Sequence, residues 1–220
     1  MEEAIEMQPN MKRQMRIWVL ISGLLSVVFY IMHDVVGALY YPGYDRMTQA
    51  VSDLTAVDAP SRIVAGGYTS VYGIFTGICC AFLCILAGRS NKVFRLGIYL
   101  FTAMNAVSAI GYSLFPLTGS GYDGSFQSFV HVYVVTVLVV LLSIVSLIVI
   151  AIGCFKEDRK VLGCLALLAL ACMFFGAAGS GALPKSVFGI VERFSTYSAV
   201  VFTGVLGIAA YKDSDRNGEK

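Results

Sequence analysis

Apolar residues occur along the chain in six long runs that are separated by short polar segments. The runs cover residues 17–39, 63–88, 93–115, 129–152, 161–183 and 187–211. Each can cross the hydrocarbon core of a bilayer as a helix, which takes about 20 residues. None alternates strictly between apolar and polar positions, as the strands of a membrane barrel would. The pattern predicts an all-α fold: a polytopic membrane bundle of six transmembrane helices, forming a single integral membrane domain over residues 1–220.

Composition supports this fold class and excludes a nucleic-acid partner. Of the 220 residues, 57% are hydrophobic and only 14% charged, and the mean hydropathy is +0.76, whereas about 25% of the residues of a soluble domain are charged. The net charge of +2 provides no broad basic surface for nucleic acid. Membrane lipids are the partners that such a chain is expected to have.

The basic residues predict the orientation of the chain in the membrane. Twelve Lys and Arg residues fall in the termini and in the segments after the second and fourth runs, and four fall in the other connections. Cytoplasmic loops carry the excess of Lys and Arg. We therefore expect a multi-pass protein of the cell membrane with both termini in the cytoplasm. The polar tails, residues 1–10 and 212–220, are expected to be mobile.

The first outer connection, residues 40–62, has a helical pattern of its own. Apolar positions recur at helical spacing opposite a polar face, with Asp45 where an N-cap should stand. The apolar positions are Met47, Ala50, Val51 and Leu54, and the polar ones are Thr48, Gln49, Ser52 and Asp53. We expect a short amphipathic helix at the outer interface, with its polar face turned either to water or over the mouth of the bundle.

Ionisable residues within the six runs gather at one level of the membrane. They are His33, Asp34, His131, Glu192 and Arg193. Such residues usually face the bundle interior or a water-filled cavity. Together with polar stripes on the other runs, they predict an outward-facing polar cup that binds a ligand. Its candidate residues are His33, Asp34, Ser52, Asp53, Asn105, Tyr112, His131, Glu192 and Arg193. The alternative is that these groups only satisfy one another and hold the helices together.

Two expectations concern contacts within the bundle. We expect Arg193 to pair with Asp53, which would fix the outer loop as a lid, while Glu192 points inward toward His131 or His33. Small residues in the fifth run, from Gly176 to Ala182, and the pair Gly73 and Gly77 in the second are expected to permit close helix packing.

Several short motifs resemble those of a known family. They are Tyr41-Pro42-Gly43-Tyr44, then Val51-Ser52-Asp53-Leu54-Thr55-Ala56 with Pro60, then Phe115-Pro116 with His131, and finally Gly189-Ile190-Val191-Glu192-Arg193. In these residues the chain resembles the prokaryotic multi-pass membrane proteins grouped as domain of unknown function 998. Thr55 stands where that family usually has Gly. The resemblance extends over nearly the whole chain and implies the fold and a shared outer-face cluster, but no established activity.

Three functions fit the candidate residues. The first is a non-enzymatic protein whose cup binds a small-molecule or lipid-derived ligand, without a cofactor. The second is a metal-assisted membrane hydrolase acting on a lipid or headgroup, in which His33, His131 and Glu192 bind Zn or Fe, with Asp34 or Asp53 as a further ligand or base. The third is a haem held by His33 and His131. A nucleophile formed by Ser52 and His131 with an acidic residue lacks any flanking elbow motif.

Overall fold

A computed structural model describes residues 8–216, and it confirms the all-α membrane bundle. Six helical segments in this range are long and apolar enough to cross a membrane. The long helices are α1 (Pro9–Leu39), α2 (Arg62–Leu86), α3 (Lys92–Leu114), α5 (Thr136–Lys156), α6 (Lys160–Ala182) and α7 (Phe188–Arg216). The fourth span also includes α4 (Phe126–Phe129) and the π-helix η3 (Val130–Val135). Short 3-10 helices are η1 (Val51–Thr55), η2 (Ala87–Arg89) and η4 (Lys185–Val187).

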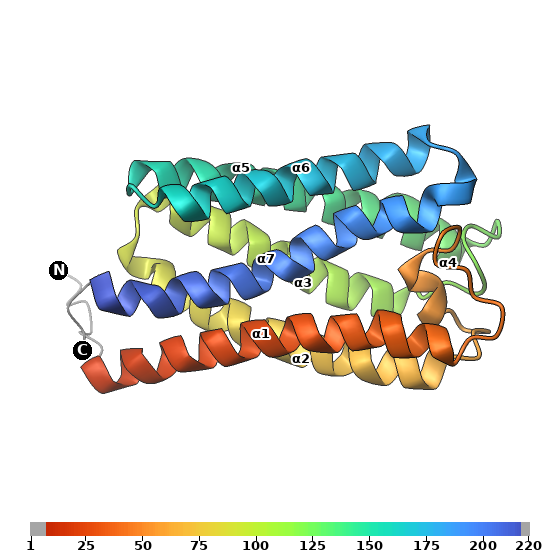
Figure 1. Cartoon of the computed structure of the whole chain (residues 1–220), viewed down its shortest axis with the longest axis horizontal. Coiled ribbons are helices and arrows are strands. Elements are labelled where there is room, and N and C mark those ends of the chain that lie inside the picture. Colours follow the sequence, from red (N-terminus) through yellow and green to blue (C-terminus); the bar gives the residue numbers. More distant parts are fainter. Residues whose placement is uncertain (1–7, 217–220) are drawn as a thin grey trace.

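The helices lie side by side along one axis, with the start of α1 and the end of α7 at the same end of the bundle (Figure 1). We call this end the terminal end and the opposite one, which carries the longer connections, the loop end. Neighbouring helices pack in the order α2, α1, α7, α6, α5, α3, and α2 packs much less extensively against α3 than against α1. The chain thus forms a ring of helices with one weak seam, between α2 and α3.

The helices extend further at the terminal end than hydropathy predicts. α1 begins at Pro9 and not near residue 17, and α7 continues to Arg216 and not to 211. Pro9 occupies the first turn of α1, where its missing N–H costs nothing. Part of each predicted tail is therefore helical. Residues 1–7 and 217–220, the rest of the tails, lie outside the described residues.

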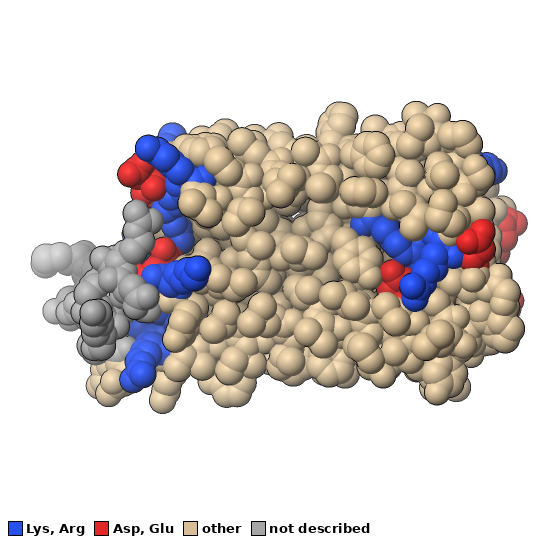
Figure 2. Space-filling view, in the orientation of Figure 1, with Lys and Arg blue, Asp and Glu red and all other residues tan. Residues whose placement is uncertain are grey.

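Charged side chains are separated by a broad band without charge. On the face in Figure 2, Lys, Arg, Asp and Glu gather at the two ends of the bundle, and the surface between them is uncharged. Large apolar side chains are exposed along the bundle, among them Leu24, Ile74, Leu141 and Leu168. Exposed apolar area on this scale is unfavourable in water but suits contact with lipid tails.

The core is apolar in the middle and at the terminal end of the bundle, and aromatic at the loop end. Phe101 of α3 and Phe202 of α7, both 1% exposed, meet edge to face with ring centroids 5.8 Å apart. Nearer the loop end, Tyr30 of α1 packs against Tyr72 of α2 at 5.0 Å and Tyr197 of α7 at 5.5 Å. The residues predicted to form the polar cup within the spans, His33, Asp34, His131, Glu192 and Arg193, lie on the loop-end side of the apolar core.

Glycines bring some helices close together, but not at every predicted place. A Cβ at Gly176 of α6 would lie 2.2 Å from the backbone nitrogen of Ser195 in α7, so only Gly fits there. The predicted close packing at Gly73 and Gly77 of α2 is wrong. A Cβ at either position would meet no described atom within 4 Å outside its own helix segment.

Candidate functional site

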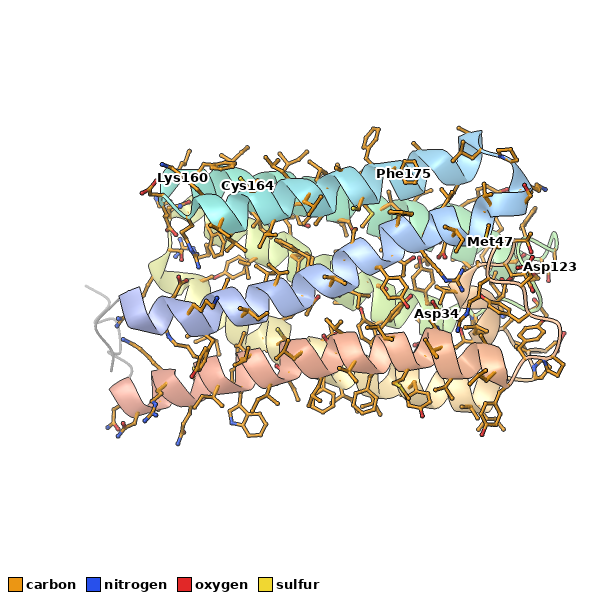
Figure 3. All side chains as sticks on the ribbon, in the orientation of Figure 1. Asp34, Met47, Asp123, Lys160, Cys164 and Phe175 are labelled. Carbon is orange, nitrogen blue, oxygen red and sulfur yellow. The ribbon has the colours of Figure 1, made fainter. Side chains whose placement is uncertain are left out.

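Asp34 and Arg193 form a buried, two-pronged ion pair between α1 and α7. Arg193 Nε donates to Asp34 Oδ2 and Nη2 donates to Asp34 Oδ1, both at 2.9 Å. The side chains are 7% and 10% exposed. Tyr197, one helical turn after Arg193, also donates its hydroxyl to Asp34 Oδ2 at 3.0 Å. Figure 3 shows Asp34 at the loop-end half of α1. The fork of a guanidinium matches two carboxylate oxygens, which makes this a strong form of ion pair.

The remaining donors of Arg193 hold the first outer loop. Nη1 lies 3.1 Å from the carbonyl oxygens of both Arg46 and Gln49, and Nη2 donates to the Tyr44 hydroxyl at 2.7 Å. The Tyr44 hydroxyl in turn donates to Ala50 O at 2.7 Å. Every N–H of the guanidinium therefore has an acceptor. The prediction that Arg193 fixes the outer loop agrees with these bonds, but the loop partners are backbone carbonyls and a tyrosine.

Gly189, one turn before Arg193, allows the loop to reach α7. Its N–H donates to Met47 O at 2.8 Å. A Cβ at this position would lie 2.3 Å from Gln49 O and 2.5 Å from Arg46 O. The loop backbone thus lies directly on the start of α7, in a contact that only glycine permits.

The predicted pair between Asp53 and Arg193 is wrong. Asp53 is 2% exposed, and its Oδ2 accepts the Ser120 hydroxyl at 2.5 Å, while Oδ1 has no hydrogen-bond donor within the described residues. Arg193 is already saturated by Asp34 and the loop, which leaves no donor for a second carboxylate. Burial raises the pKa of Asp53, although the bond from Ser120 acts in the opposite direction.

The first outer loop does contain a short helix, but it is a 3-10 turn that begins after Ala50 and not at Asp45. Asp45 accepts the Met47 N–H at 2.9 Å and the Thr48 hydroxyl at 2.9 Å, which closes a turn and starts no helix. The helical part is only the 3-10 helix η1, and it is buried at Val51, Asp53 and Leu54. Two backbone bonds tie this loop to the next one: Val57 N–H to Leu117 O at 2.7 Å and Asp58 N–H to Thr118 O at 3.0 Å. The two loops together cover the loop end.

Glu192 of α7 contacts the first outer loop from the side of the bundle interior. Its Oε2 accepts the Val51 N–H at 3.3 Å, and its Oε1 accepts the Thr196 hydroxyl at 3.0 Å. The side chain is half-buried. Within residues 8–216, no Lys or Arg nitrogen forms an ion pair with it. Glu192 is thus a carboxylate inside a membrane span with only neutral donors.

His131 lies in the π-helix that opens the fourth span. Its Nδ1 is 2.7 Å from Phe115 O, and because a carbonyl only accepts, Nδ1 carries the proton. Its ring centroid lies 4.6 Å from that of Tyr112. In the wider turn the His131 carbonyl accepts both the backbone N–H of Thr136 and its hydroxyl, the latter at 2.8 Å. The Thr136 hydroxyl is also 3.1 Å from the Tyr112 hydroxyl. Single π-turns of this kind are frequent at functional sites.

His33 is held on the other side of the bundle. Its Nδ1 lies 3.2 Å from Ala65 O of α2, and its ring is 5.5 Å from that of Tyr30. Each histidine therefore directs its Nδ1 to a backbone carbonyl. The structure does not bring His33, His131 and Glu192 together as metal ligands. In the part of the chain that it describes, no three His, Cys, Asp or Glu side chains are grouped so that they could hold a metal ion.

Asn105 and Ser52 contribute less than expected. Asn105 donates to Phe101 O of its own helix at 3.0 Å and is half-buried. Ser52 contributes its carbonyl, which accepts the Thr55 hydroxyl at 3.1 Å. Sequence reasoning missed Tyr44, Tyr197 and Ser120 as partners of the charged residues. Tyr197 could have been found, since it shares a helix face with Arg193 at a spacing of four.

A comparison with family models matches residues 24–209 to the family described as protein of unknown function (DUF998). Neither the search of curated proteins nor that of solved structures found a match. The matched range contains the Asp34–Arg193 pair, the loop that this pair holds, and both histidines. Because the match covers well over half of the chain, this membrane protein belongs to the family of unknown function DUF998.

Proposed function

We propose that the loop end holds a binding site for a small or lipid-derived ligand that carries a hydrogen-bond donor or a positive charge. The observation that supports this proposal is that Glu192 has only neutral hydrogen-bond donors among the described residues. A carboxylate within a membrane span is costly unless it is compensated. The cation next to it in sequence, Arg193, is taken by Asp34. The bonds from Val51 and Thr196 leave further acceptor capacity on Glu192 for a ligand.

The aromatic surroundings support a ligand with a positively charged group. Val51, which donates to Glu192, belongs to the same buried cluster as Tyr30, and Tyr72 and Tyr197 pack against that cluster. Tyrosine faces attract cations, most strongly where water is excluded. A carboxylate beside several tyrosines is therefore suited to an amine headgroup or a similar cation.

The seam between α2 and α3 supports entry from the membrane. These two helices pack weakly against each other. From its loop-end start to just past its middle, α2 carries Gly66, Gly67, Gly73 and Gly77, each with open space where a Cβ would stand. A lipid-derived ligand could reach the site sideways along this face. The apolar core toward the terminal end favours binding over passage of a polar solute through the bundle.

The distribution of basic residues supports an outward-facing site in the cell membrane. Eleven of the fifteen Lys and Arg residues between positions 8 and 216 belong to the terminal end, and Arg46, Arg62, Lys185 and Arg193 belong to the loop end. By the positive-inside rule the terminal end is cytoplasmic and the loop end is outside. The hydrolase alternative lacks a supporting observation of this kind, because no three His, Cys, Asp or Glu side chains are grouped as metal ligands among the described residues. For the haem alternative, the described contacts of His33 and His131 are with backbone carbonyls and neighbouring tyrosines, and they add no support.

The proposal is tested by thermal unfolding of the purified protein in lipid nanodiscs. Nanodiscs of phosphatidylcholine are compared with ones that also contain phosphatidylethanolamine, whose amine can donate hydrogen bonds. We expect phosphatidylethanolamine to raise the melting temperature of the parent protein but not of Glu192→Gln. The control is Asp58→Asn, which changes an exposed residue of the first outer loop and should respond like the parent. A rise that Glu192→Gln retains in full, or no rise in the parent, would reject an amine-headgroup ligand at Glu192.

A further inference from the structure

Asp53 is a second carboxyl side chain of the loop end that lacks an ion pair with Lys or Arg within the described residues. It belongs to η1 and is 2% exposed. Its Oδ2 accepts the Ser120 hydroxyl at 2.5 Å, whereas Oδ1 is buried and makes no hydrogen bond to any described residue. An ionised carboxyl is costly in such surroundings, because one of its oxygens has lost water and gained no donor. The group needs a proton or a cation to compensate it.

Asp53 and Glu192 approach each other at the start of η1. Glu192 Oε2 accepts the N–H of Val51, the first residue of η1, at 3.3 Å. The N–H of Ala50, one residue earlier, faces the Asp53 carboxyl. Two consecutive N–H groups of the chain thus bring the two carboxyls to one place, where they are close enough to interact electrostatically. We call these two residues the acidic pair.

The positive charges near the acidic pair are engaged elsewhere. Arg193 faces both acids, but its N–H groups donate to Asp34, to a tyrosine and to backbone carbonyls. Arg46 donates to the carbonyl oxygens of Asp34 and Val35 at the end of α1, both at 3.3 Å. Arg193 therefore offsets the charge of the pair only from a distance and forms no bond to it.

The other titratable groups that face the acidic pair are tyrosines. Tyr44 of the first outer loop faces Asp53, and Tyr30 of α1 and Tyr112 of α3 face Glu192. A tyrosine hydroxyl is neutral near pH 7 and adds no positive charge. Two neighbouring carboxyls without a bound cation do not both ionise readily, so one of them keeps a proton.

Asp53 is the member of the pair that is better suited to keep this proton. It is almost completely buried, and burial raises the pKa of its carboxyl. Glu192 is half-buried and accepts bonds from Val51 and Thr196. Donors of this kind favour the ionised form of a carboxyl.

We propose that Asp53 is a second acidic residue of the loop-end binding site, which holds a proton while the site is empty and releases it when a cationic ligand binds. This inference rests on the function proposed above. A primary ammonium group has three N–H donors, so it can donate to Glu192 and to Asp53 Oδ1 together. The O–H bond of Asp53 breaks, and the proton passes to water. One positive charge enters the site for each one that leaves, so the net charge of the site stays constant.

The test is isothermal titration calorimetry of the full-length protein in phosphatidylcholine nanodiscs, with a soluble short-chain phosphatidylethanolamine as the probe. Titrations between pH 4 and pH 8 are each run in two buffers with different heats of ionisation, which gives the number of protons released per bound probe. Empty nanodiscs provide the blank. The variants are Asp53→Asn, Ser120→Ala and Glu192→Gln, and the control is Asp58→Asn, an exposed acid of the same loop.

We expect the parent and Asp58→Asn to release up to one proton per bound probe. Their affinity should rise by up to about tenfold per pH unit below the pKa of Asp53, which is the limit for exchange of one proton. Asp53→Asn should release no proton and bind with an affinity that does not change with pH. Ser120→Ala removes a donor that favours ionised Asp53, so the rise in affinity should extend to higher pH. If Asp53→Asn fails to fold, this shift decides.

Three results would contradict the inference. Binding that Glu192→Gln abolishes, without proton release from the parent at any pH, would overturn it and leave the proposed function intact. Proton release that Asp53→Asn retains would assign the proton to another group, such as a histidine, and would overturn it as well. No binding by the parent at any pH would reject the amine ligand, and the exchange at Asp53 with it.

Discussion

Arg193 and Asp34 are 159 positions apart in the sequence, yet the two nitrogens of one and the two oxygens of the other lie 2.9 Å apart in matching pairs. The same guanidinium donates hydrogen bonds to two backbone carbonyls of the first outer loop. One side chain thus joins the last turns of α1, the first turns of α7 and the segment that covers them. An arginine used in this way is a structural element of the loop end.

We expect Asp34→Asn and Arg193→Gln each to lower the free energy of unfolding by about 3–5 kcal/mol, because the remaining partner is left buried without its counter-charge. The measurement is denaturant or thermal unfolding in detergent micelles. The double variant should lose less than the sum of the single losses. Asp58→Asn, at an exposed site in the same loop, is the control. Additive losses would show that the two residues do not interact.

The same loop contact makes a second prediction at Gly189. Gly189→Ala places a methyl group 2.3 Å from Gln49 O, so the loop must move away from α7. Overpacking of this kind costs about 1–3 kcal/mol. Protease cleavage in the loop should become faster and the melting temperature should fall. The control is Gly181→Ala on α6, where nothing lies within 4 Å of the added atom, and it should leave both measurements unchanged. If Gly189→Ala also left both unchanged, the contact between the loop and α7 would be refuted.

Hydropathy alone locates the six spans, because an uninterrupted apolar run of about 20 residues is the length that a membrane helix requires. It also identifies Asp34 and Arg193 as unusual, since both are charged within a span. It does not identify them as partners. The sequence favours Asp53 as the partner of Arg193 because both belong to the outer side, whereas the adjacency of α1 and α7 depends on how helices pack, which no periodicity records. The π-turn at His131 could not be predicted from the sequence for a similar reason. Its residues, Val130–Val135, have no composition that distinguishes them from those of an α-helix.

The proposed orientation predicts the behaviour of reporter fusions. A phosphatase that is active only outside the cytoplasm, fused after residue 220, should be inactive, because the terminal end carries most of the Lys and Arg residues. The same phosphatase fused after residue 184, in the connection between α6 and α7, should be active. A fluorescent protein that folds only in the cytoplasm should give the reverse pattern. Activity of the phosphatase at position 220 would invert the bundle and place the loop-end cluster inside the cell.

Asp53 makes the last prediction, which concerns pH. Burial raises the pKa of this carboxyl above its ordinary value of 3.8. At a pH between 3.8 and the raised pKa, Asp53 is protonated in the folded protein and ionised in the unfolded chain. Stability contributed by Asp53 is therefore present below pH 3.8 and is lost as the pH rises through the folded pKa. Asp53→Asn cannot lose a proton, and its amide oxygen can still accept the Ser120 hydroxyl. The melting temperature of Asp53→Asn minus that of the parent should rise between pH 4 and pH 7, by more than the same difference for Asp58→Asn, which controls for removal of one acid from the loop. A difference for Asp53→Asn that falls with increasing pH would mean that Asp53 is stabilised as a carboxylate, and that its unpartnered Oδ1 has a donor in solution.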